Sequence, residues 1–315
     1  MMSTQGIIWT EGMFLAPQHF QHMDASIRNL LNEHVSLDLI GDDYGLSRIE
    51  INEDLLRIGK LSVKSASGIL PDRNFFDLSS EIALEIPNGT VDSVVCLAVP
   101  LALSGVAQIG VTSSINRITK RELKLYDLTD SESEPVEAEL AELNLSLKFE
   151  SEDLSSFAYI PIVKILEKTS EGKLILDRNF MPTAISLQAN TLLVEKLGEI
   201  LSLSKARAEN ASVRLKSVQD SQTQLSLISE KFELQILNKW ILRLQNQVHE
   251  PLSSPRLAYY NLATMAVEML ALSNDTTPEN FVFNNQKPTE SFNTVLNMLR
   301  ALLTLEKSET VIELN

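Results

Sequence analysis

The most informative segment of this chain is Trp9-Thr10-Glu11-Gly12-Met13-Phe14-Leu15-Ala16-Pro17-Gln18-His19-Phe20-Gln21, close to the N-terminus. It is rich in large apolar side chains, although most soluble proteins begin with ragged, polar residues. Chain termini are usually poorly ordered unless something ties them down. We therefore expect this segment to be docked, either on its own domain or on a partner.

A targeting signal does not explain the apolar terminus. A secretory signal begins with basic residues and continues into an uninterrupted apolar run. Here no Lys or Arg precedes Arg28, and Glu11, Gly12 and Pro17 interrupt the run. The chain also has no apolar stretch of the roughly 18 residues that a transmembrane helix needs. We expect neither export by a recognisable route nor direct insertion into a membrane.

The composition narrows the class of protein. The chain has 315 residues, 44% of them hydrophobic, and a formal net charge of -15. That length is enough for about two domains, and the hydrophobic content excludes wholesale disorder. The negative charge argues against a nucleic-acid partner and against anionic lipid. The single cysteine, Cys96, lies in the apolar run Val94–Val99 and is interpreted as a buried small side chain. The absence of an internal disulfide fits a reducing cytoplasm.

Residues 44 to about 180 alternate apolar and polar side chains, a period that predicts half-buried strands. The clearest runs are Leu46–Ile51, Leu56–Val63, Ile82–Ile86, Leu123–Leu125 and Leu143–Phe149. Turn residues separate these runs, which favours an antiparallel β-sandwich. Before them, Phe20, Met23, Ile27, Leu30, Leu31 and His34 recur at helical spacing, so one amphipathic helix is expected over residues 17–38.

From about residue 187 the apolar period becomes helical. The pattern predicts helices around residues 193–204 and 225–248, a third that begins at Ser254-Pro255 and a fourth that follows Pro288. Short connections, apart from residues 273–287, most simply give an antiparallel, up-and-down four-helix bundle. The polar residues 211–223 are either a solvated turn or an exposed helix end.

The apolar rows of this bundle leave two alternatives open. They pack only inside one chain, or they also pack against helices of neighbouring copies. The candidates for bundle or intersubunit packing are Phe232, Trp240, Ile241, Leu244, Phe292 and Leu299.

Motifs for catalysis are weak. His19 and His22, with Asp24 nearby, could be metal ligands, but a zinc site usually needs three or four ligands with a supporting shell. Since neither His34 nor His249 lies in a ligand motif, the histidines are interpreted as helix-surface or cap residues. No glycine-rich phosphate loop or G-x-S-x-G elbow occurs. The acidic pairs Asp42-Asp43, Asp130 to Glu134 and Glu150 to Asp153 are interpreted as solvated loops, with a cation site as the alternative. We expect no catalytic residue, no cofactor and no metal; a hydrolase that uses Asp42, Asp43 or His19 is the weakest hypothesis.

The segment Trp9–Gln21 resembles the opening signature of the TssK family (also called ImpJ or VasE), a baseplate component of bacterial type VI secretion systems. The pattern W-x-E-G-M-F-L-x-P-Q-H-F-Q is long and rich in rare residues. Looser agreement continues at Phe157–Ile162 and Leu176–Pro182.

The resemblance implies a structural adaptor rather than an enzyme. Members of the family are homotrimers whose N-terminal β-sandwich is similar to the shoulder of siphophage receptor-binding proteins and docks on the TssF–TssG wedge. A helical neck follows, and a C-terminal head contacts TssL and TssM of the membrane complex. The sequence ends at Asn315, where that head would begin, so contact with TssL and TssM is not expected of this chain. A location on the cytoplasmic side of the inner membrane is implied.

The expected organisation is therefore an arm, helix and β-sandwich over residues 1–183, followed by a helical neck over residues 184–315. The expected wedge anchors are Trp9, Phe14, Leu15, Pro17 and Phe20, because interface centres favour Trp, Phe and Met. The competing interpretation is that these side chains only fasten the arm to its own sandwich. The alternative function from another class is an adhesin-like β-sandwich that binds carbohydrate or peptide.

Overall fold

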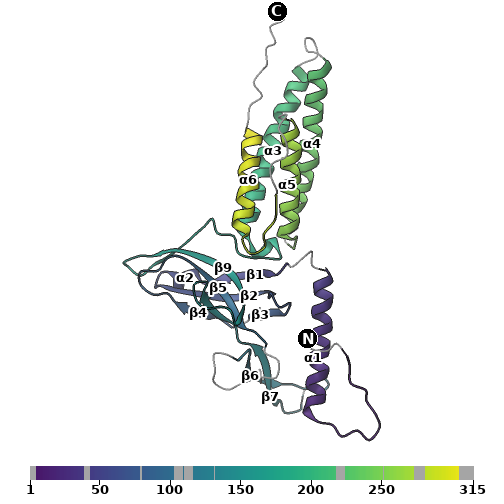
Figure 1. The fold of residues 1–315 in the computed structure, drawn as a ribbon, viewed down its shortest axis with the longest axis vertical. Helices are drawn as coiled ribbons and strands as arrows, with labels where there is room; N and C mark the ends of the chain where they lie inside the picture. Colours follow the sequence, from purple (N-terminus) through teal and green to yellow (C-terminus); the bar gives the residue numbers. More distant parts are fainter. Residues whose placement is uncertain are drawn as a thin grey trace, which may run out of the picture. The chain divides into compact units, whose positions relative to one another are not determined.

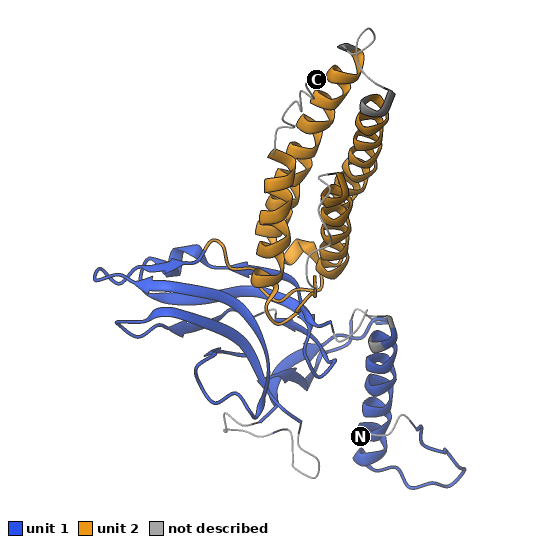
Figure 2. Ribbon diagram, turned by 45° about the horizontal axis from the view of Figure 1, so that its top comes forward, with its two compact units in different colours: residues 1–177 blue, residues 178–315 orange. Residues whose placement is uncertain are grey.

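The computed structural model describes residues 5–38, 43–78, 80–102, 109, 116–130, 132–217, 224–250, 252–272 and 281–304. The chain divides into two compact units, residues 1–177 and residues 178–315 (Figure 2). Each unit is described separately below, with the element labels of Figure 1.

The described residues of the first unit form one long helix, a short helix and ten strands. The elements are α1 Pro17–Asp38, β1 Gly45–Ile51, α2 Glu53–Leu56, β2 Lys60–Ile69, β3 Phe75–Leu78, β4 Ile82–Glu85, β5 Val91–Pro100, β6 Ile118–Leu125, β7 Val136–Leu143, β8 Ser146–Phe149, β9 Phe157–Lys168 and β10 Leu174–Leu176. One four-stranded sheet has the order β1-β2-β3, with β4 also paired to β2. The other has the order β10-β9-β5-β8, and β6 and β7 form a sheet of their own. Every pair of these strands is antiparallel, which confirms the predicted class of sheet.

Two of the predicted strand runs are wrong in detail. Leu56 ends the short helix α2 instead of starting a strand, because Asn52 caps that helix by accepting a hydrogen bond from the Asp54 N–H at 3.2 Å. Gly59, at φ +79°, then turns the chain into β2. The run Leu143–Phe149 also breaks, since β7 ends at Leu143 and β8 begins at Ser146. Local capping and turns override the alternation at both places.

The centre of the second sheet is its most buried part. Residues 95–100 of β5 are all buried between β8 and β9, so both faces of the strand are covered. Cys96 lies in this run and is fully buried, as predicted. Burial, together with the nearby carboxylates of Glu150 and Glu152, raises the pKa of its thiol to about 12. A thiol in this environment stays protonated and unreactive at neutral pH.

In the second unit, the described ranges form a bundle of four helices. They are α3 Thr191–Ser217, α4 Gln224–His249, α5 Pro255–Leu272 and α6 Pro288–Thr304, preceded by a 3₁₀ turn at Leu187–Ala189. Ser254 accepts a hydrogen bond from the Arg256 N–H at 3.2 Å and Pro255 is the first helical residue, as the sequence predicts. The residues up to Ser217 belong to α3, where Ala211 is fully buried and Val213 and Lys216 are exposed.

The direction of α6 differs from the up-and-down expectation. Near the start of both helices, the rings of Tyr259 in α5 and Phe292 in α6 lie 5.7 Å apart, so these two helices run parallel. By contrast, Trp240 Nε1 in α4 donates to Glu268 Oε2 in α5 at 2.7 Å, and Asn261 of α5 donates to Gln247 of α4. Those pairs make α4 and α5 antiparallel. The long connection between α5 and α6 allows the chain to return before it enters α6.

Most of the predicted packing residues form the core of the bundle. Trp240, Leu244, Phe292 and Leu299 are fully buried in one apolar cluster, and Ile241 packs against it. Phe232 differs, because 56% of it is exposed on the outer side of α4. It does not serve the core of its own chain.

One buried ion pair joins three helices of the bundle. Arg207 Nε of α3 lies 2.6 Å from Glu233 Oε1 of α4, and the Glu233 side chain has no exposed surface. Arg207 Nη1 also donates to the carbonyl oxygen of Leu302 in α6 at 2.5 Å. Arg214 adds a contact of 3.6 Å to the second carboxylate oxygen of Glu233. The pattern of apolar residues alone gave no signal for this network.

Candidate partner-binding surface

The N-terminal arm folds back onto the start of α1. Gly12 turns the arm at φ +77°, and the His19 Nδ1 accepts a hydrogen bond from the Ala16 N–H at 3.0 Å. The ring of Trp9 lies 6.2 Å from both the His19 and the Phe20 rings. His22 Nε2 lies 3.0 Å from the Gln5 carbonyl oxygen. These local contacts give the two histidines structural roles and define the shape of the arm.

The arm keeps its apolar side chains on the surface. Phe14 is 91% exposed and Trp9 is 49% exposed, while Leu15, Pro17 and Phe20 are exposed as well. The ring contacts of Trp9 in the described structure are with its own arm and helix rather than with the sandwich. Phe14 and about half of Trp9 are thus open to solvent in the described structure.

Helix α1 exposes its apolar stripe, whereas the opposite side of the helix is less exposed. Its apolar stripe consists of Phe20, Met23, Ile27, Leu30 and Leu31, and all five side chains are exposed. Roughly 180° away around the helix, Ala25, Asn29 and Asn32 are less exposed.

One contact from that side reaches the connection between β2 and β3. Asn32 Nδ2 donates to Asn74 Oδ1 at 3.3 Å. A soluble helix normally buries its apolar stripe. The stripe of α1 is therefore available to another surface.

The β6–β7 hairpin is a second amphipathic element with an uncovered apolar face. Residues directly opposite in an antiparallel pair lie on the same face of the ribbon. The register pairs Leu123 with Ala138, Leu125 with Val136 and Arg121 with Leu140. This face is largely apolar and its large side chains are exposed: Leu123, Leu125, Val136 and Leu140.

The other face of the hairpin is charged. It carries Lys120, Glu122 and Lys124 on β6, and Glu137 and Glu139 on β7. Lys120 Nζ lies 2.5 Å from Glu139 Oε2 across the ribbon. The two faces of one hairpin thus have opposite character, although both are in contact with solvent.

The turn of the hairpin is ordered by Asp127. Its carboxylate accepts hydrogen bonds from the hydroxyl and the N–H of Thr129, at 2.6 and 2.7 Å. The bond from the hydroxyl, which has the larger effect, and the bond from the N–H hold the pKa of Asp127 below its ordinary value. Leu128, beside this anchored residue, is completely exposed.

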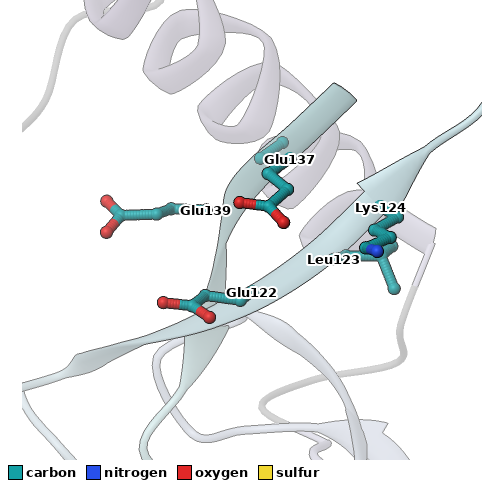
Figure 3. A pocket seen from close by; sticks show the side chains of 6 residues that line it. Glu122, Leu123, Lys124, Glu137 and Glu139 are labelled. Carbon is teal, nitrogen blue, oxygen red and sulfur yellow. The ribbon is translucent and has the colours of Figure 1, made fainter. Parts of the chain in front are cut away.

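An open hollow of about 450 Å³ lies along the hairpin and is lined by residues 122–124 and 137–139. Figure 3 shows the three glutamates Glu122, Glu137 and Glu139 with Lys124 beside Leu123. The described residues contain no group of three or more potential metal-ligating side chains. The hollow therefore presents a charged surface.

The acidic loops have different environments. Glu150 and Asp153 are exposed, as predicted, whereas Asp43 is buried and its carbonyl oxygen accepts a hydrogen bond from Arg73 Nη1 at 2.6 Å. The prediction of a solvated loop is therefore wrong for Asp43, which the Arg73 contact holds against the sheet. Asp42 lies outside the described residues.

The outer side of the helical bundle also carries exposed apolar residues near one end. Val213 of α3, with Ile228 and Phe232 of α4, are each more than half exposed. Sequence periodicity left open whether Phe232 packs inside one chain or against a neighbouring copy, because a helical period does not distinguish the core of one chain from a contact between chains. Among the described residues, none of the helices combines the length and apolar character needed to cross a bilayer.

Comparison with known proteins gives one consistent family. The family model described as bacterial type VI secretion, with the members EvfL, ImpJ and VasE, matches residues 19–315. The type VI secretion system baseplate component TssK1 of Pseudomonas aeruginosa is 26% identical over 306 residues, which cover 94% of this chain and 68% of that protein.

Solved structures show the same fold. A crystal structure of TssK superposes with a TM-score of 0.89 and 25% identity, and the match covers 96% of this chain and 71% of that one. A chain of the type VI secretion TssK-TssF-TssG baseplate subcomplex superposes with a TM-score of 0.82 at 22% identity, over 96% of this chain and 99% of that chain. The family model covers nearly the whole sequence, so the chain belongs to the TssK family of type VI secretion baseplate components, a structural rather than an enzymatic family.

Proposed function

We propose that the chain is a trimeric adaptor of the type VI secretion baseplate that docks on a TssF–TssG wedge through its N-terminal arm. The observation that carries this proposal is the exposed apolar arm, with Phe14 at 91% exposure and Trp9 folded against the start of α1. Soluble proteins rarely expose a contiguous apolar patch of this kind unless it contacts a partner. A related TssK chain is part of a TssK-TssF-TssG baseplate subcomplex, which supplies the partner.

The trimer is supported by the helical unit. Phe232 is more than half exposed on α4 together with Ile228, and Val213 on α3 is exposed to a similar extent. Apolar residues on the outside of a bundle are typical of helices that pack against helices of other subunits. Light scattering is expected to give three times the mass of one chain, and a monomer at micromolar concentration would contradict the trimer.

The match covers 68% of the curated TssK1. We propose that contacts with TssL and TssM are made by a part of such relatives that lies outside this match. We place the chain on the cytoplasmic side of the inner membrane, where a baseplate adaptor would act.

The experiment is co-purification with TssF and TssG from the same secretion system. The double substitution Trp9→Ala with Phe14→Ala is expected to abolish co-purification while the protein keeps its fold and its trimer. Arg28→Ala on α1, whose exposed pair with Asp24 at 2.6 Å contributes little, serves as a control. Unfolding of the double variant would show that the arm is part of the core, and unchanged binding would contradict the wedge contact.

A further inference from the structure

Two uncovered apolar faces lie in the same folding unit. One is the stripe of α1 that continues past the arm, formed by Met23, Ile27, Leu30, Leu31 and Leu37. The other is the apolar face of the β6–β7 hairpin, defined above by Leu123, Leu125, Val136 and Leu140, with Tyr126 and Leu128 at its turn. A helix stripe against a sheet face is one of the few stable ways to bury both.

We propose that the apolar stripe of α1 in one copy packs on the apolar face of the β6–β7 hairpin in a second copy. The proposal rests on the proposed trimer and says how its shell units hold together. The contact is head-to-tail, since the helix of one copy meets the hairpin of the next, and such contacts close into a ring when the rotation between copies closes.

The β6–β7 hairpin requires another element packed on its apolar face to be stable. A two-stranded ribbon is at best marginally stable in water by itself, and β6 and β7 form a sheet separate from the two four-stranded sheets. Its eight cross-strand pairs are nevertheless regular from Ile118–Leu143 to Leu125–Val136. A helix laid across the apolar face would supply the missing layer.

The two faces match in length and area. The stripe from Met23 to Leu37 spans roughly 21 Å at 1.5 Å per residue, and the strand from Thr119 to Leu125 spans roughly 20 Å. Taking roughly 150–200 Å² for a fully exposed large apolar side chain, the observed exposures leave on the order of 1,000 Å² on the two faces together. That area reaches the lower limit of a specific interface.

Charge favours these faces as the place where copies meet. The chain has a net charge of -15, so most surfaces of two copies repel each other. The apolar face of the hairpin carries Arg121 and Glu142, which neutralise each other at 2.7 Å. The carboxylates of the hairpin's central pairs, Glu122, Glu137 and Glu139, lie on the opposite face.

A contact between the two faces within one chain is disfavoured. Both faces are exposed in the single chain, so they do not cover each other there. The polar side of α1 is tied to the connection between β2 and β3 through Asn32 and Asn74, which leaves the apolar stripe turned away. A second copy therefore provides the occupant.

Disulfide trapping between two differently tagged copies tests this contact. One copy carries Leu30→Cys and the other carries Leu123→Cys; the matched control replaces Leu123→Cys by Lys124→Cys, the next residue on the charged face. Cys96 is the single native cysteine and is fully buried, so it does not compete for oxidation. The mass of each reduced variant is measured by light scattering.

We expect a disulfide between the two tagged copies with Leu123→Cys and its loss with Lys124→Cys. Equal yields for the two pairs, or no disulfide from a protein that remains trimeric, would overturn this contact and leave the trimer intact. A disulfide formed only within one chain that carries both substitutions would also overturn it. A monomeric mass for the unmodified protein would remove the trimer and this contact together.

Discussion

Removing one partner of the buried ion pair between α3 and α4 is expected to destabilise the helical unit. Arg207→Met keeps most of the side-chain stem and removes the charge that faces Glu233, whose side chain has no exposed surface. The Leu302 carbonyl also loses its 2.5 Å donor. Removing one partner of a buried pair costs roughly 3–5 kcal/mol. Because Arg214 stays 3.6 Å from the same carboxylate, we expect the lower end, about 3 kcal/mol.

Urea unfolding followed by Trp240 fluorescence measures this loss. The chain has two tryptophans, so Trp9→Phe leaves Trp240 as the single reporter of the helical unit. Trp240 is fully buried and its indole N–H donates to Glu268 at 2.7 Å. With a slope of about 2 kcal/mol per molar urea, the unfolding midpoint is expected to fall by roughly 1.5 M.

Two variants control for other causes. Arg300→Met breaks the pair with Glu199 between α6 and α3, which is partly exposed and is expected to contribute about 1 kcal/mol or less. The double variant Arg207→Met with Glu233→Met removes both buried charges and is expected to return close to the stability of the parent protein. A loss for Arg207→Met no larger than for Arg300→Met, or a double variant as unstable as Arg207→Met, would refute the reasoning.

The remaining predictions concern pH, packing and reactivity. The hydrogen bond from Arg300, followed by its charge, lowers the pKa of Glu199 from its ordinary 4.5. A lowered carboxyl pKa stabilises the fold at pH values above the pKa of the unfolded state, so the stability difference between the parent protein and Arg300→Met should shrink as the pH falls below about 4.5. A difference that grows there would contradict the assignment. Gly68→Ala would place a Cβ 2.2 Å from a backbone oxygen of the neighbouring strand and should destabilise by roughly 1–3 kcal/mol or more. Gly198→Ala in α3 has nothing within 4 Å and should stabilise by roughly 0.5–1 kcal/mol in the same urea assay; equal effects of the two would be inconsistent with the packing. Cys96, with its pKa raised to about 12, should react with a disulfide reagent at pH 8 only after unfolding, so prompt labelling of the native protein would show that the run is open.

Much of the fold is predictable from periodicity and capping. The alternation of apolar residues predicts β1, β4 and parts of β2, β6 and β8, but not β3, β5, β9 or β10. The helical spacing of six residues predicts α1, which spans Pro17–Asp38. The start of α5 is predicted because Ser254 is a favoured N-cap residue and Pro255 is favoured at the first helical position. These signals are local, so the sequence carries them directly.

Other features depend on contacts that no local pattern specifies. The direction of α6 is set by the long connection before it and by the packing of Phe292 on Tyr259. The pairing of Arg207 with Glu233 joins residues 26 positions apart that have no motif in common. The exposure of Phe232 has the same origin, because its helical spacing is also compatible with a core position.

The sequence of the N-terminal arm identifies the family but does not determine what its side chains contact. Its rare residues predict membership of the TssK family, which the family model over residues 19–315 confirms. The same residues do not determine whether Trp9 packs on its own sheet or on a partner. That distinction depends on the exposure of Trp9 and Phe14, which needs the structure.

The most direct test of a wedge-binding adaptor is the stoichiometric co-purification of this chain with TssF and TssG from its own system. The parent protein is expected to form a complex that contains trimers of the chain, and Trp9→Ala with Phe14→Ala is expected to remain a folded trimer outside that complex. Failure of the parent protein to bind TssF and TssG, or equal binding by the double variant, would contradict the account.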